Sequence, residues 1–171
     1  DMDNTFDHGA NYTDIPSQYV NADPCDPESI GDTGGQGHIP IWNSLLNNDE
    51  FFADYINRWT DLSNNYFSCD FLISHLDSLI TLIEPEMPRQ INRWGGNYNI
   101  WQSNVNEMRD FIEDRCEIIN SGILDCYEDE YGIEGPYSVT INIEPALSGI
   151  VEINNYPINN YPFIGSYFGG V

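Results

Sequence analysis

The residues best suited to chemistry stand at the start of the chain, in the stretch Asp1-Met2-Asp3-Asn4-Thr5-Phe6. On an extended backbone, side chains two positions apart share one face, so Asp1 and Asp3 are able to converge on one hard cation. Carboxylate oxygens suit Mg²⁺ or Ca²⁺, and Mg²⁺ is typically held by one or two carboxylates together with substrate phosphates. The pair therefore predicts a metal site in which either carboxylate, or both, is the ligand.

Further segments follow the acidic opening in order and make the pattern more specific. They are Gly37-His38-Ile39-Pro40, Asn57-Arg58-Trp59-Thr60-Asp61-Leu62, Pro85-Glu86-Met87-Pro88-Arg89-Gln90-Ile91, Arg93-Trp94-Gly95 and Arg109-Asp110-Phe111. Together with the opening, they make residues 1–120 resemble the C-terminal half of the spore-coat protein H (CotH-like) family of atypical protein kinases. The Pro-Glu-Met-Pro-Arg stretch and the acidic opening carry most of the specificity.

This resemblance implies a fold, an activity and a cofactor. The fold is α+β: mainly a helical bundle resembling the C-terminal lobe of a protein-kinase-like fold, followed by a short partial antiparallel β-module. The activity is ATP-dependent transfer of a phosphoryl group to Ser or Thr of a protein substrate. In the family the acidic motif binds the metal that accompanies ATP, so Asp1 and Asp3 become the candidate metal- and cofactor-binding residues, for Mg²⁺ or Mn²⁺ with ATP.

The absence of lysine limits this interpretation. A kinase needs a cation on the phosphates and a carboxylate that orients the acceptor hydroxyl. The nucleotide-gripping lobe and the catalytic aspartate are expected before residue 1, so we expect a piece of a longer kinase that is inactive by itself. The alternative function is a non-catalytic extracellular or cell-surface interaction module on a kinase-like scaffold.

The chain is strongly acidic, with 28 Asp and Glu against five arginines among 171 residues and a net charge of −23. A basic patch is the footprint of nucleic-acid binding, so this charge argues against a nucleic-acid partner. An anionic membrane surface would repel the chain for the same reason. No run of 18 apolar residues occurs, which argues against membrane insertion.

The four cysteines, Cys25, Cys69, Cys116 and Cys126, form no Cys-x-x-Cys pair, which argues against a zinc ribbon or a thioredoxin motif. Their even number, with the missing lysine and the high Asn, Asp and Tyr content, favours a secreted protein located outside the cell or on its surface. Four cysteines allow three connectivities. Among the pairs, we expect Cys116–Cys126, because a helix end and its return loop would lie between them.

Two arginines are candidates for a second contact site. Arg89 and Arg93 sit one helical turn apart and would project together. They would contact a phosphate or an acidic substrate, or they would pair with nearby carboxylates such as Glu86. The excess of acids in the chain favours pairing.

The elements that position these residues follow from residue periodicity. Residues 7–37 are rich in Gly, Pro, Asn and Asp, which predicts a long irregular loop. Helices are expected from residue 41 onward, the last of them from about Ile100 to Ile119. The expected helix caps and stops are Asn48 or Asp49, Asp70, and Gly95-Gly96.

Apolar residues recur at helical spacing along these segments, and we expect them to face the core. They are Ile41, Leu45 and Leu46; Phe51, Phe52, Tyr55, Ile56, Trp59 and Leu62; Phe71, Leu72, Leu76, Leu79, Ile80 and Ile83; and Trp101, Val105, Met108, Phe111, Ile112 and Ile119.

The domain organisation follows from a change of character after Gly122. Residues 1–122 are expected to form the C-terminal part of the CotH-like kinase domain, and 123–136 an acidic linker. Residues 137–171 alternate apolar and polar positions, which predicts the start of a β-module. This module is too short to close a sandwich, so its last strand should have an unpaired edge.

Overall fold

The computed structural model describes residues 38–146, 148–154 and 156–171. Helices dominate and a small antiparallel β-module follows them, which confirms the expected α+β class. The helices are α2 (His38–Leu46), α3 (Asp49–Asn64), α4 (Cys69–Ile83), the 3₁₀ turn η3 (Glu84–Glu86), α5 (Met87–Trp94) and α6 (Tyr98–Tyr131). The strands are β1 (Glu134–Ile141), β2 (Val151–Ile153), β3 (Tyr156–Ile158) and β4 (Phe163–Gly169). The expected loop over 7–37 lies outside the described residues.

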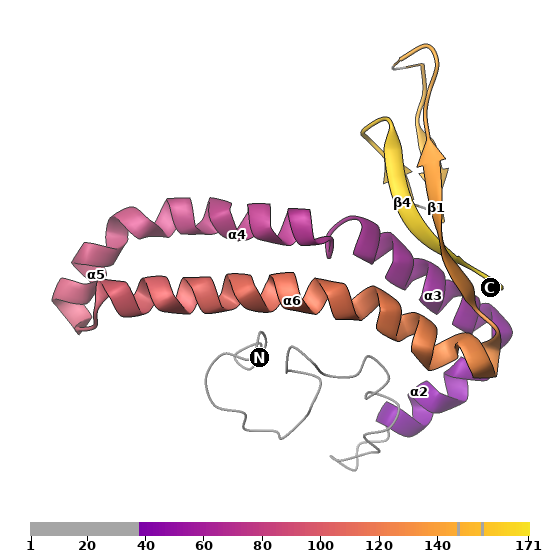
Figure 1. Ribbon diagram of the computed structural model, residues 1–171, viewed down its shortest axis with the longest axis horizontal. Helices are drawn as coiled ribbons and strands as arrows, with labels where there is room; N and C mark the ends of the chain where they lie inside the picture. The colour runs from indigo at the N-terminus through magenta and orange to yellow at the C-terminus, as the bar shows by residue number, and fades with distance from the viewer. Residues whose placement is uncertain (1–37, 147, 155) are drawn as a thin grey trace.

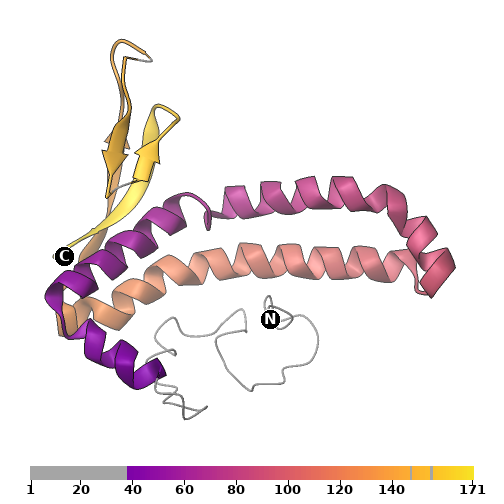
Figure 2. The ribbon, with the colours of Figure 1, turned by 180° about the vertical axis from the view of Figure 1, so that it is seen from behind.

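The helices form an elongated hairpin, in which α3 and α4 run along α6 and α5 closes the far end (Figures 1 and 2). Asn48 caps α3 as expected, because its side chain accepts a hydrogen bond from the backbone N–H three residues on. Ser68 caps α4 in the same way, so the expected cap at Asp70 is wrong. Asp70 lies in the first turn of α4 instead, where its charge complements the helix dipole. Gly95 ends α5 as expected, with a φ of 81° that favours glycine.

The last helix, α6, is longer than the sequence pattern predicted. The expected end near Ile119 is wrong, because α6 continues to Tyr131 and stops at Gly132, which has a left-handed φ of 72°. Most of the expected acidic linker is therefore helical. The physical reason is that Ile123 and Tyr127, one turn apart, are both 1% exposed and hold this part of the helix against the core. The division of the chain into domains stays a prediction.

The main core lies at one end of the hairpin, where α2, α3, the end of α6 and the start of β1 meet. Its buried members are Leu46, Phe52, Ile56, Ile123, Tyr127 and Ile133. The ring of Phe52 stacks on that of Tyr131 at a centroid distance of 4.2 Å and meets Tyr127 edge-on at 5.2 Å. Phe168 of β4 packs against the same cluster. The helices and the β-module thus share one core.

Away from that end, the hairpin buries less than the sequence pattern predicted. Of the side chains expected to face the core, Phe71, Leu79 and Ile83 of α4 are exposed; on α2, at the core end itself, Ile41 and Leu45 are exposed as well. Leu76 is the buried residue of α4. Along the hairpin α4 packs against α6, and one partner helix covers only one stripe of side chains. The stripe that was expected to be buried is therefore only partly covered.

The β-module consists of two separate two-stranded antiparallel sheets. β1 pairs with β4, from Glu134 opposite Gly169 to Ile141 opposite Phe163. β2 pairs with β3 around a tight turn that contains Asn154. Each described strand has one strand partner, so β4 has the unpaired edge that was expected.

A disulfide joins Cys69, at the start of α4, to Cys116 in α6, with the two Cα atoms 5.9 Å apart. The expected bridge between Cys116 and Cys126 is wrong. Both residues lie on α6, where a rise of about 1.5 Å per residue separates their Cα atoms by roughly 15 Å, and a disulfide spans less than about 7 Å. None of the described cysteines is free.

Among the described residues, no single helix combines the length and the apolar composition that a membrane crossing requires. One bent pair, Asp49–Asn64 with Cys69–Trp94, meets both requirements together, with an angle of 53° at its break.

Candidate functional site

The predicted metal ligands Asp1 and Asp3 lie outside the described residues, so the structure does not place them. Within residues 38–146, 148–154 and 156–171, no group of three or more His, Cys, Asp and Glu side chains is arranged to hold a metal ion. The site that the described chain does form lies elsewhere, between α3 and the β-module.

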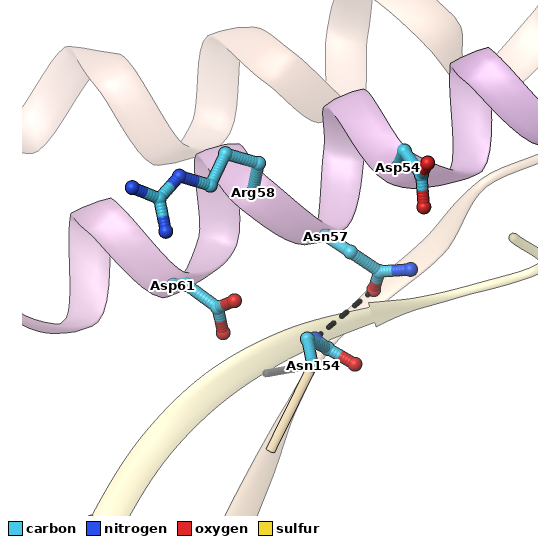
Figure 3. A pocket seen from close by; sticks show the side chains of 5 residues that line it. All are labelled: Asp54, Asn57, Arg58, Asp61 and Asn154. Carbon is cyan, nitrogen blue, oxygen red and sulfur yellow. Dashed lines mark hydrogen bonds between the residues drawn. The ribbon is translucent and has the colours of Figure 1, made fainter. Parts of the chain in front are cut away.

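A pocket of about 410 Å³ opens along one face of α3 (Figure 3). Helical spacing at i, i+3, i+4 and i+7 places Asp54, Asn57, Arg58 and Asp61 on that face. Asn154 lines the pocket from the other side, at the turn between β2 and β3. All five lining side chains are polar, and they come from two parts of the chain that are distant in sequence.

Asp61 is the most unusual member of the pocket, because its carboxylate is almost completely removed from water. The residue is 1% exposed. Its Oδ1 accepts a long hydrogen bond of 3.4 Å from the Tyr167 hydroxyl, while its Oδ2 accepts no hydrogen bond of good geometry, although the Asn154 amide is near enough to the carboxylate to favour its charged form. A buried carboxylate oxygen without a partner is energetically costly and calls for an explanation.

Burial raises the pKa of Asp61, and this effect outweighs the groups that lower it. Those groups are the Asn154 amide, the Tyr167 hydroxyl and the positive charge of Arg58. Burial, followed by the negative charge of Asp61, in turn raises the pKa of the Tyr167 hydroxyl. Tyr167 therefore keeps its proton at neutral pH and acts as the donor in this pair.

Asn154 is positioned by an uncommon backbone conformation. Its φ is 49°, in the left-handed region that asparagine enters more readily than most residues. From there its Nδ2 donates to Oδ1 of Asn57 at 3.2 Å (Figure 3). This bond joins α3 to the β2–β3 turn, the two parts of the chain that line the pocket.

The arginines predicted as a second contact site lie at the far tip of the hairpin. Arg89 pairs with Glu86 at 3.6 Å, as the excess of acids favoured, although both side chains are well exposed. An exposed pair of this kind contributes at most about 1 kcal/mol. The guanidinium of Arg93 lies over the ring of Trp94 at 5.0 Å.

The sequence pattern gives no signal that Asp61 is buried. Helical spacing puts Asp61 on one face with Asp54, Asn57 and Arg58, but a polar face of this kind usually predicts exposure to solvent and not burial. Nothing in the sequence pairs Asn154 with α3, because that contact depends on how the β-module folds back onto the helix.

Comparison with known families gives the class of the protein. The mainly helical α+β chain matches the model of the CotH kinase protein family over residues 1–119. The chain therefore belongs to the CotH kinase protein family. No curated protein and no solved structure matches it.

The matched region extends from the acidic opening into α6 and stops before the β-module. Four of the five pocket residues therefore lie inside the family match, on α3, and Asn154 lies beyond it. The pocket is built jointly by the family helices and the module that follows them.

Proposed function

We propose that the protein to which these residues belong is a CotH-like, ATP-dependent protein kinase that phosphorylates Ser or Thr hydroxyls. The observation that carries this proposal is the family match over residues 1–119, which includes the acidic opening. In this proposal Asp1 and Asp3 hold the Mg²⁺ or Mn²⁺ that accompanies ATP. Two carboxylates are too few for a closed Mg²⁺ site without the phosphates of the substrate.

In this proposal the groups that grip the phosphates come from residues other than these 171. Phosphoryl transfer needs a cation on the phosphates and a carboxylate that orients the acceptor hydroxyl. The chain has no lysine. Among its arginines, Arg89 and Arg109 are paired with carboxylates of their own region. In this proposal the 171-residue chain therefore contributes the metal-holding part of the site, through Asp1 and Asp3.

The disulfide supports a proposed location outside the cell. Cys69–Cys116 joins α4 to α6, and bonds of this kind persist in oxidising compartments. The high negative charge favours solubility in such a setting.

The test is phosphate transfer from radiolabelled ATP to a Ser-rich acceptor by the full-length protein, with Mg²⁺ and with Mn²⁺. Asp1→Asn and Asp3→Asn are compared with Asp14→Asn, which lies outside the acidic motif. Losing one preorganised electrostatic group typically costs about 100-fold in rate, so at least one of the first two variants should fall that far. Titration calorimetry should rank the variants in the same order by their affinity for Mg²⁺ and ATP.

Unchanged transfer in both motif variants would remove the metal role from Asp1 and Asp3. The 171-residue chain by itself is expected to transfer no phosphate, because it lacks the phosphate-gripping cation. Transfer by this chain that disappears in Asp3→Asn would show that the catalytic groups are misassigned.

A second candidate function is a non-catalytic interaction module on the same scaffold. The observation that favours it is a group of exposed apolar side chains at the closed end of the hairpin: Leu82 is 72% exposed, Trp94 70% and Ile100 61%. Large apolar side chains exposed at one end of a molecule suit an interaction surface. An absence of transfer by the full-length protein, with nucleotide affinity unchanged in the motif variants, would favour this function.

A further inference from the structure

The pocket on α3 has features of a ligand site that the proposed kinase activity does not use. Asp61 Oδ2 is buried and unpartnered, and the carboxylate lines a pocket of about 410 Å³ (Figure 3). Pockets that bind small ligands span about 300–1,000 Å³, so the volume suits a ligand of modest size. A group in the pocket that donates a hydrogen bond would satisfy the orphaned oxygen and offset its desolvation.

The lining groups define the chemistry of that ligand. The carboxylates of Asp54 and Asp61 only accept hydrogen bonds when ionised, and the guanidinium of Arg58 only donates. The Asn57 oxygen is taken by Asn154, so the Asn57 amide has its nitrogen to offer to a ligand. A matching ligand must therefore both donate and accept within a short span, as a hydroxyl group does.

The charge of the lining residues restricts the class of ligand further. The two carboxylates and one guanidinium give the pocket an excess of negative charge, within a chain of net charge −23. Phosphates and other anions are therefore disfavoured. A bare metal cation is disfavoured as well, because Arg58 is one of the lining residues and only two carboxylates are present. A neutral ligand that carries several hydroxyl groups meets all of these conditions.

We propose that this pocket binds one sugar unit of a carbohydrate. In this arrangement the Asp61 carboxylate accepts from one hydroxyl, and Arg58 and the Asn57 amide donate to neighbouring oxygens. Planar carboxylate, amide and guanidinium groups suit adjacent hydroxyls, because each offers two hydrogen-bonding positions in one plane. Because Asn154 belongs to the β-module, a bound sugar would contact both parts of the chain at once.

The test uses the ¹⁵N-labelled 171-residue chain and follows its backbone and side-chain amide signals by NMR. D-glucose, D-galactose and N-acetyl-D-glucosamine are titrated separately into the millimolar range. Glycine and CaCl₂ are titrated in parallel, as a zwitterion and a cation of comparable or smaller size. At least one sugar is expected to shift the side-chain amides of Asn57 and Asn154 in a saturable way.

Three variants and one control locate the effect. Asp61→Asn should weaken sugar binding roughly tenfold or more, which is the loss typical of a hydrogen bond to a charged group. Asn154→Gly removes the amide while glycine tolerates the left-handed backbone. Asp54→Asn, at the exposed rim, keeps the test valid if the buried substitution impairs folding. Asp110→Asn, exposed on α6 and outside the pocket, should bind as the wild type does.

The proposal fails if none of the three sugars shifts the pocket amides. It also fails if the shifts persist in Asp61→Asn and Asp54→Asn, or if glycine or Ca²⁺ saturates the pocket while the sugars do not. Loss of phosphate transfer in the acidic-motif variants leaves this result untouched, so the two proposals are tested independently.

Discussion

The side-chain amide of Asn64 pairs with the backbone of Ser166 through two hydrogen bonds of 2.8 Å. Its Nδ2 donates to the Ser166 carbonyl, and its Oδ1 accepts from the Ser166 N–H. The same Nδ2 also donates to the carbonyl of Thr60 within α3. Asn64 thus occupies hydrogen-bonding positions that a neighbouring strand would use, and it fastens the end of α3 to β4.

Replacing Asn64 should weaken the attachment of the β-module. Asn64→Ala leaves the N–H and the carbonyl of Ser166 without these partners, and we expect a loss of about 1–3 kcal/mol in unfolding free energy. Urea denaturation measures the change. The matched control is Asn47→Ala, whose amide donates to the Asn43 carbonyl on the exposed face of α2. Equal losses in the two variants would contradict a special role for Asn64.

Asp61 should make stability depend on pH. Because its pKa is raised by burial, the folded chain binds this proton more tightly than the unfolded chain does. Asp61 therefore lowers the free energy of unfolding as the pH rises above 3.8, the ordinary pKa of this group, and through its raised pKa in the folded chain. Asp61→Asn removes this penalty and should be more stable than wild type at pH 7, by about 1–3 kcal/mol.

The pH profile of that difference is the decisive measurement. The advantage of Asp61→Asn should shrink as the pH is lowered and should vanish near pH 3.8. Asp110→Asn, at an exposed position, serves as the control for removing one negative charge. An advantage of the same size at every pH would show that burial of the charge is not the cause.

The bond between Cys69 and Cys116 should stabilise the hairpin. It closes a loop of 47 positions, for which the chain-entropy estimate is about 4 kcal/mol. The double variant Cys69→Ser, Cys116→Ser should lose stability on that order, as measured by thermal or urea unfolding. Non-reducing peptide mapping should recover Cys69 and Cys116 in one linked pair. Recovery of a Cys116–Cys126 pair would overturn the assignment.

Hydrogen exchange should distinguish the two ends of the hairpin. The end formed by α2, α3 and the start of β1 contains the buried core, whereas η3 and α5 contain no buried residue. Amides of η3, α5 and the adjoining turn should therefore exchange faster than those around Ile56 and Ile123. Uniform protection along the helices would mean that the hairpin opens only as a single unit.

The sequence by itself determined the class of the chain and some of the helix boundaries. Helical spacing of apolar residues required helices, Asn48 and Gly95 marked a start and a stop, and the order of short segments indicated the CotH family before any contact was known. These features are local, because capping and periodicity depend on residues within a turn or two of one another.

Only the tertiary structure decided which residues meet. The partner of Cys116 depends on α4 lying beside α6, and the end of α6 depends on the core that buries Ile123 and Tyr127. The pocket depends on the β2–β3 turn, which brings Asn154 to α3 from 97 positions away. Periodicity shows which face of a helix is apolar, but the number of neighbouring elements decides how much of that face is covered. That is why Leu79 and Ile83 are exposed, while the charged Asp61 is buried.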